Sequence, residues 1–275
     1  MNKRDKIFLS FFFILYVIAW YFNYNYLKNV SPQEAFKNLG HRWVVYIGPV
    51  VINPATLINA AIVFSLIIWL VLSVRKMKLV PDRKQSFVEW LLESIHEMVE
   101  DSIPDPRFVR PTFVVAMTIF LFVWFSNILG SFPGIVFNGW EDGTLHSIEL
   151  FTDTWQAPTA DLNTNLTYAL MVFVISHAFA IKAKGFKAWL KGWFEPNPVM
   201  LPMNVIGELA KPLSHSLRLF GNIAGGAILT FIFSYMVKYF LLPVFLWGFF
   251  GLFVGTIQAL VFSILVIAYI SAQLT

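Results

Sequence analysis

The chain has 275 residues, of which 57% are hydrophobic and only 13% charged, and its mean hydropathy is +0.67. This composition is typical of a protein that crosses a membrane several times, and it excludes a soluble domain built around one apolar core. The absence of cysteine excludes disulfides and thiolate metal sites, and no other metal or cofactor site is expected. The net charge of +4 does not indicate nucleic-acid binding, because lysine and arginine mark loop sidedness in membrane chains.

Six segments are apolar enough to enter a membrane: residues 7–22, 53–74, 113–132, 162–181, 203–238 and 242–274. The first is short for a span, and it fits an uncleaved anchor helix better than a signal peptide because no convincing cleavage site follows. We therefore expect an N-terminal anchor or signal-like helix with an outer connector in residues 1–52, then one membrane domain in residues 53–275. Pro104, Pro106 and Pro111 are expected to break the chain before the third segment.

Residues 85–102 predict an amphipathic helix that is too charged to span. Phe87, Leu91, Ile95 and Met98 share one face, and glutamates cover the other. This helix is expected in the inner membrane interface. The predicted fold class is thus an all-α polytopic membrane protein, with about six membrane helices and one interfacial helix. Its last two helices form a long tilted hairpin, in which Pro212 is the natural position for a kink.

Charged residues predict which loops face the cytoplasm. Five lysines and arginines follow the second segment between residues 75 and 84, and four lysines lie between residues 182 and 191. Both basic stretches are expected on the inner side. Residues 131–160 contain four acidic residues and neither lysine nor arginine, which is typical of an outer loop.

The most informative stretch is residues 209–226, LAKPLSHSLRLFGNIAGG, which places Arg218 within an apolar helix. A charge at mid-membrane costs about 2.5–3.5 kcal/mol on insertion scales, so a chain that keeps it there uses it. On a helical projection Arg218 shares a stripe with His215 and Asn222, opposite a wall of larger apolar side chains. A purely structural alternative is a buried arginine that pairs with a carboxylate of its own chain. The nearest acid in the same helix is Glu208, however, about 15 Å away. The partner carboxylate is therefore expected in another subunit.

Other polar residues fall at the ends or on one face of the membrane segments. Asn127 is the one strongly polar residue inside the third segment, and Thr159, Asp161 and Asn163 open the fourth. Asp161 fits a helix N-cap and a water-lined role about equally well. Gln258 shares a face of the last helix with Gly251 and Gly255 and is expected opposite Arg218; the same stripe also fits a plain helix-packing seam.

Several motifs together resemble subunit a of the bacterial F-type ATP synthase. They are SLRLFGN (216–222), KP (211–212), PTADLN (158–163), SNILGSFPG (126–134) and QAxxF (258–262). They appear in the family order from about residue 53 to the end of the chain, and the arginine-centred motif is the most specific. The first fifty residues carry little of the resemblance.

The resemblance implies a fold, a function and partners. Two long tilted helices would curve against a ring of subunit c, with subunit b and the catalytic head as further partners in a multi-pass protein of the bacterial inner membrane. The family's essential arginine maps onto Arg218, its hairpin glutamine onto Gln258, and its outer half-channel onto Asn127, Thr159, Asp161, Asn163 and Asn222. No phosphate loop GxxxxGK[ST] occurs, so ATP would be made in partner subunits and this chain would be a non-catalytic subunit.

The chain departs from a well-known version of this pattern at two positions. That version has a glutamate where this chain has Ala227 and a histidine where it has Gly251. Water, or His215 and Asp161, would replace these groups in the ion pathway. Protons are the expected coupling ion and sodium is the main alternative; a secondary ion transporter is less favoured, because it should show inverted repeats and none are found.

Overall fold

The structure is a computed structural model of the chain. It describes residues 10, 13, 14, 17, 21, 43, 45–47, 50–74, 81–139, 144–155, 157–195, 197–236, 246 and 248–274. The predicted anchor helix over residues 7–22 and the basic residues 75–80 lie outside the described residues, apart from isolated positions of the anchor.

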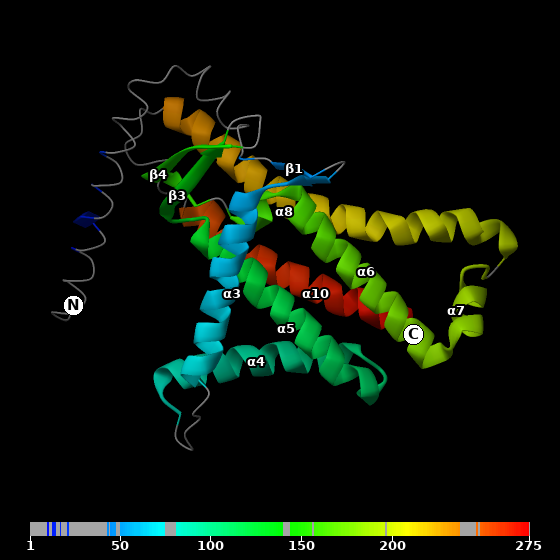
Figure 1. Cartoon of the computed structure of the whole chain (residues 1–275). Coiled ribbons are helices and arrows are strands. Elements are labelled where there is room, and N and C mark those ends of the chain that lie inside the picture. The colour runs from blue at the N-terminus through cyan, green and yellow to red at the C-terminus, as the bar shows by residue number, and fades with distance from the viewer. Residues whose placement is uncertain are drawn as a thin grey trace.

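Helices make up most of the described chain (Figure 1). They are α3 (Pro54–Val74), α4 (Arg83–Ser102), α5 (Pro106–Leu129), α6 (Leu162–Lys184), α7 (Phe186–Gly192), α8 (Leu201–Met236) and α10 (Gly255–Leu274), with the 3₁₀-helices η1 (Pro158–Ala160) and η2 (Pro198–Met200) and the π-helix η3 (Gly248–Val254). Among the described residues, four segments are long and apolar enough to cross a membrane: Pro54–Ser73, Pro106–Leu129, Leu162–Lys184 and Gly248–Leu274. The all-α polytopic class predicted from the sequence is confirmed.

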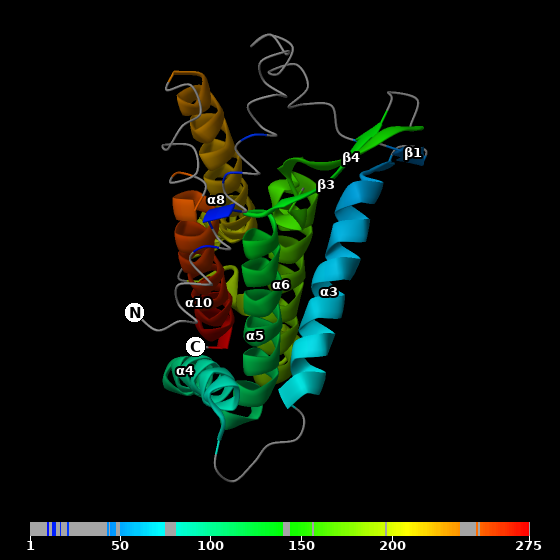
Figure 2. The ribbon, with the colours of Figure 1, turned by 90° about the vertical axis from the view of Figure 1, so that its left-hand side faces the viewer.

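The core lies where α5, α6 and α10 pack together. Figure 2 shows α10, α5, α6 and α3 side by side, and α10 is the main partner of α5. Val123 of α5 and Phe262 and Val266 of α10 are fully buried in this core. α5 begins at Pro106, earlier than predicted, because a proline fits the first helical turn and Asp105 caps it by accepting the Arg107 N–H. Pro111 lies inside the helix, so the predicted break there was wrong.

α8 is the longest helix and lies against α6. Its 36 residues correspond to about 54 Å, against about 30 Å of hydrocarbon. The helix continues through Pro212 without interruption and changes direction along its length (Figure 1). A long, bent α8 beside η3 and α10 matches the predicted C-terminal hairpin, whose connection lies outside the described residues.

α4 is the predicted amphipathic helix, but its buried face is narrower than expected. Ile95 and Val99 are buried, whereas Phe87 and Met98 are 50% and 37% exposed. The reason is that α4 packs on α5 and on the last turn of α10, where the Ser271 hydroxyl donates to the Ser102 carbonyl over 2.6 Å. The buried stripe of α4 therefore runs through Ile95 and Val99, and Met98 lies beside it.

Two antiparallel β-hairpins were not predicted. Strand β1 (Val45–Ile47) pairs with β2 (Val50–Ile52), and β3 (Pro133–Gly139) pairs with the longer β4 (Leu145–Thr154). The second hairpin occupies the acidic segment that was expected to be an outer loop. Short apolar runs on both sides of a polar turn, such as residues 135–137 and 148–151, are compatible with strands even in a mainly helical chain.

The helix bundle has two distinct ends. At one end the close of α5 meets η1 and the start of α10, next to the β3–β4 hairpin (Figure 2). At the other end the start of α5 meets the close of α6, where the rings of Phe108 and Phe179 lie 5.3 Å apart. Lys182 and Lys184 follow Phe179, so this second end is expected to face the cytoplasm. We call the two ends the outer end and the inner end.

Candidate ion pathway

Arg218 lies on the exposed side of α8. The opposite side of the same turns is buried against the bundle through His215, Ser216 and Leu219. Arg218 is exposed, as are Leu213 and Leu217, and Asn222 lies at the edge of this exposed side, next to α10. The ion pairs found in the described part of the chain leave the guanidinium without a carboxylate partner.

Gln258 joins α10 to the arginine-bearing face of α8. The Asn222 side-chain amide donates to the Gln258 amide oxygen over 2.7 Å, and Gln258 is only 5% exposed. The sequence placed Gln258 opposite Arg218, and the structure places it opposite Asn222, one helical turn further along α8. Within the described residues the amide nitrogen of Gln258 is buried without a hydrogen-bond partner.

His215 does not face outward with Arg218, as the helical projection suggested. It is 1% exposed, and its ring centroid lies 3.6 Å from that of Phe262 and 5.5 Å from that of Tyr269. Neither ring nitrogen has a hydrogen-bond partner among the described residues. His215 therefore packs against α10 on the buried side of the helical turn that carries Arg218.

Asn127 and Thr159 belong to a buried hydrogen-bond network at the outer end. Thr159 donates to the Asn127 amide oxygen over 2.8 Å, and the Asn127 amide donates to the Gly255 carbonyl over 2.9 Å. The Asn165 amide extends the network by donating to the Thr159 carbonyl over 2.8 Å. All three side chains are buried. We call this set, Asn127, Thr159, Asn165 and the Gly255 carbonyl, the outer network; it ties α5, η1 and α6 to the junction of η3 and α10.

The glycines of η3 and α10 explain one departure from the family pattern. A Cβ atom on Gly251 would lie 1.9 Å from the Ser131 hydroxyl oxygen, and one on Gly255 would lie 2.9 Å from the Asn127 Cβ. The backbone of this helix thus approaches α5 too closely for any side chain at position 251. A histidine could not replace Gly251 here unless Ser131 and the end of α5 moved.

Asp161 and Asn163 lie at the start of α6. Asp161 is the N-cap predicted as one of its two roles, since its carboxylate accepts the Asn163 backbone N–H over 3.0 Å. Its other carboxylate oxygen accepts the Thr56 hydroxyl of α3 over 3.3 Å. The Asn163 side chain is exposed. The two residues therefore offer polar atoms at the outer surface, next to the buried outer network.

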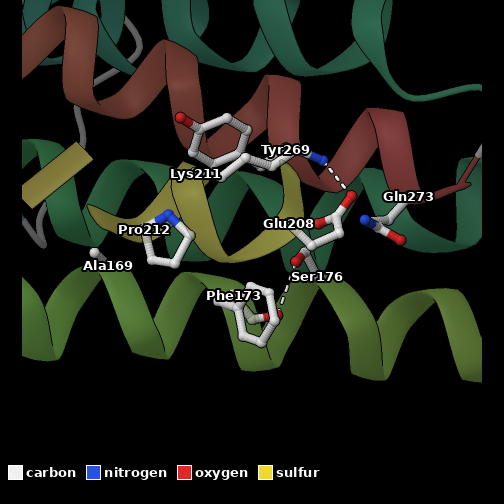
Figure 3. A pocket seen from close by; sticks show the side chains of 8 residues that line it. All are labelled: Ala169, Phe173, Ser176, Glu208, Lys211, Pro212, Tyr269 and Gln273. Carbon is white, nitrogen blue, oxygen red and sulfur yellow. Dashed lines mark hydrogen bonds and ion pairs between the residues drawn. The ribbon is translucent and has the colours of Figure 1, made fainter. Parts of the chain in front are cut away.

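A small pocket between α6, α8 and α10 gathers charged residues toward the inner end (Figure 3). Its lining residues are Ala169, Phe173, Ser176, Glu208, Lys211, Pro212, Tyr269 and Gln273. Lys211 donates to one oxygen of the Glu208 carboxylate, and His177 Nε2 lies 3.7 Å from the other. The pocket has space for about one water molecule. We call Glu208, Lys211 and His177 the inner cluster.

Sequence reasoning missed the inner cluster. Glu208 was considered only as a distant partner for Arg218, and His177 was assigned no role in the ion pathway. The spacing of Glu208 and Lys211, three residues apart on one helix face, was the available signal for an ion pair. The contact with His177 joins residues 31 positions apart and had no signal in a single sequence.

A bundle of membrane-crossing helices with an unpaired arginine on one exposed helix face and polar clusters toward both ends is typical of a membrane protein that moves ions. Comparison with known proteins gives the family. Residues 54–271 match the family model described as ATP synthase A chain.

Curated relatives agree with this match. The chain is 31% identical to ATP synthase subunit a of Bacillus subtilis over 254 residues, which cover 86% of this chain and 98% of that protein. It is 33% identical to ATP synthase subunit a of Priestia megaterium over 222 residues, or 78% and 89% of the two chains. For the subunit of Bacillus pumilus the identity is 31% over 220 residues, or 74% and 85%. The chain belongs to the ATP synthase A chain family.

Proposed function

We propose that Arg218 separates two offset half-channels through which an ion reaches and leaves a ring of subunit c. As a family member the chain is a membrane protein of the ATP synthase complex and acts in ion translocation by its membrane sector. The coupling ion we propose is the proton. Residues 53–275 would form the membrane domain, in the inner membrane of a bacterial cell.

The proposed mechanism follows from the cost of charge in lipid. A carboxylate on the ring crosses lipid only when an ion neutralises it, because an isolated charge there is too costly. The ion enters from the outer half-channel, the ring turns almost a full circle, and the ion leaves through the inner half-channel. Arg218 favours the ionised carboxylate nearby and blocks direct passage between the half-channels. Because arginine stays protonated in proteins, this barrier is permanent.

One observation carries the proposal: the guanidinium of Arg218 is exposed and has no carboxylate in the described part of its own chain. The helix behind it is packed, with His215 and Leu219 buried. An arginine on an apolar helix needs a partner charge. A carboxylate that arrives on another subunit would meet it on this face.

Polar residues on the two sides of Arg218 support offset half-channels. Outside, we propose a path past Asp161 and Asn163 toward Asn222 and Gln258, with Asn127 and Thr159 forming its wall and His215 lying behind it. Inside, Glu208 lies about ten residues before Arg218, or about 15 Å along α8, and would line the exit.

Other parts of the complex would supply what this chain lacks. We propose the c ring, the subunit b stalk, the catalytic head and membrane lipid as partners. ATP chemistry would occur in the head, because the sequence has no phosphate loop.

The test is ATP-driven ion uptake into vesicles that hold the purified complex, with and without sodium, for wild type and Arg218→Ala. We expect acidification in sodium-free buffer, and loss of acidification in a variant that still assembles. Full pumping by Arg218→Ala would contradict the proposed role of the arginine. If uptake requires sodium, the proposed role of Arg218 stands, and the coupling ion is sodium instead of the proton.

A further inference from the structure

The inner cluster is linked to the surface helix α7 by a hydrogen bond. The Trp189 indole N–H donates to His177 Nδ1 over 3.2 Å, and the two rings meet edge to face at 5.8 Å between centroids. Gly185 makes this contact possible, because its φ of 84° turns the chain sharply between α6 and α7. Trp189 on α7 is thereby brought back to His177 on α6.

This hydrogen bond determines which nitrogen of His177 carries the proton. An indole N–H is only a donor, so Nδ1 must act as an acceptor and hold no proton itself. The proton of the neutral ring then lies on Nε2. Nε2 is buried, has no hydrogen-bond partner among the described residues, and lies 3.7 Å from a Glu208 carboxylate oxygen. A small rotation of either side chain brings the two atoms within hydrogen-bond distance.

The inner cluster thus offers Glu208 a donor at each oxygen. Lys211 donates to one oxygen, and His177 Nε2 lies 3.7 Å from the other. The titratable or charged groups that face Glu208 come from all three packed helices: His177 on α6, Lys211 on α8 and, at the pocket wall, Tyr269 on α10. The rings of Phe173 and Trp193 pack near the imidazole, at 4.3 and 5.7 Å between centroids, and make no hydrogen bond to it among the described residues.

We propose that Trp189 and His177 are positioning residues that hold the Glu208 carboxylate at the inner exit of the ion path. This inference rests on the proposed function. Trp189 fixes the tautomer of His177, and the Nε2 proton of His177 fixes the rotamer of Glu208 in the pocket. The surface helix α7 thereby becomes part of the machinery for ion release, although none of its residues touches the ion.

The test compares Trp189→Phe with Trp193→Phe in the whole complex. Both changes keep an aromatic ring against His177, but only the first removes the N–H that bonds to Nδ1. We expect Trp189→Phe to slow ATP-driven acidification about two- to tenfold, the range for one neutral hydrogen bond. Trp193→Phe should stay near wild type, with equal amounts of complex recovered from the membrane. Equal rates for the two variants would overturn the proposal.

Two backgrounds show whether the effect acts through the cluster. In Glu208→Gln the additional change Trp189→Phe should have no further effect, and a full further loss would mean that Trp189 acts elsewhere. If Glu208→Gln leaves too little activity, His177→Gln serves instead, because its amide donates to Glu208 without a choice of tautomer. Trp189→Phe should then be silent, and a persistent loss would overturn the proposal. Arg218→Ala in the same vesicles separates the two proposals, since its continued pumping would refute the half-channel function itself.

Discussion

The two ends of the helix bundle use polar residues in opposite ways. At the outer end neutral side chains bond to each other and to a backbone carbonyl in a buried network that joins four elements. At the inner end charged and titratable side chains surround a pocket with space for about one water. A neutral polar group in apolar surroundings needs hydrogen-bond partners, and in the outer network the Asn165 amide oxygen lacks one among the described residues. A charge must instead keep a counter-charge or water nearby. The outer network is therefore expected to govern assembly, and the inner cluster to govern transport rate.

The largest effect on assembly is expected from Gly251→His, which places a side chain where η3 and the residues after α5 lie in close contact at the outer end. The new Cβ would meet the Ser131 hydroxyl oxygen at 1.9 Å, so α5 and η3 would have to separate. We expect a severe loss of complex recovered from membranes. Gly248→Ala is the matched control, because a Cβ there has open space and should leave recovery unchanged. Normal recovery of Gly251→His would show that the outer end adapts more easily than its packing indicates.

Asn127→Leu should have the next largest effect on assembly. It removes the side-chain donor to the Gly255 carbonyl, which keeps its bond within α10, and it removes the acceptor of the Thr159 hydroxyl, which is left buried and unpaired. An unpaired buried group costs about 1–3 kcal/mol. Thermal unfolding of the purified complex should show a lower midpoint for this chain, while residual complexes pump at a nearly normal rate per molecule. A large loss of rate with unchanged thermal stability would reverse the roles assigned to the two ends.

Glu208→Gln is the corresponding change at the inner end. It keeps the shape of the side chain and removes its charge, so the ion pair with Lys211 and the contact with His177 are weakened. We expect complex recovery close to wild type and ATP-driven acidification slower by about tenfold, or about 1.4 kcal/mol in the barrier. A pumping assay normalised to the amount of complex measures this, and an unchanged rate would remove Glu208 from the ion path.

Thr56→Val should have the smallest effect. Its hydroxyl donates to Asp161 over 3.3 Å, a long bond at a partly buried site. Asp161 keeps its role as N-cap through the Asn163 backbone N–H, so we expect a loss of stability below about 1 kcal/mol and almost unchanged pumping. Asp161→Ala is the comparison variant, because it removes both the N-cap of α6 and the hydrogen bond to Thr56, and it should lower stability more. If both variants lower stability equally, the hydrogen bond to Thr56 of α3 is the more important of the two contacts.

Much of the fold follows from the sequence, because hydropathy identifies membrane helices directly. From residue 53 onward, the predicted bounds of the membrane helices and of the amphipathic helix agree with the structure within several residues. An N-cap was one of the two roles that the sequence allowed for Asp161. The β3–β4 hairpin was missed because the acidic residues of this segment were interpreted as an outer loop and its strand pattern was not used. Pro111 was expected to break the helix because an interior proline removes a backbone hydrogen bond, yet α5 continues through it.

The site was predicted less evenly, for geometric reasons. Residues three apart on a helix differ by about 60° in direction, so the projection could not separate His215, which is buried, from Arg218, which is exposed. Gln258 was predicted to lie opposite Arg218, and it contacts Asn222 instead. The register between two helices depends on how they pack, and the sequence of either helix alone does not determine it. The contacts of Trp189 with His177 and of His177 with Glu208 depend on the turn at Gly185, and a single sequence does not show where that turn points.

The π-helix η3 has a consequence for chain length. In a π-helix each N–H bonds five residues back, so the segment Gly248–Val254 holds a residue more than an α-helix of the same number of turns. Deletion of one residue there lets the segment close as an ordinary α-helix without rotating α10 beyond it. Gln258 would then still meet Asn222, so this segment is where the hairpin can gain or lose a residue while its two helices stay in register.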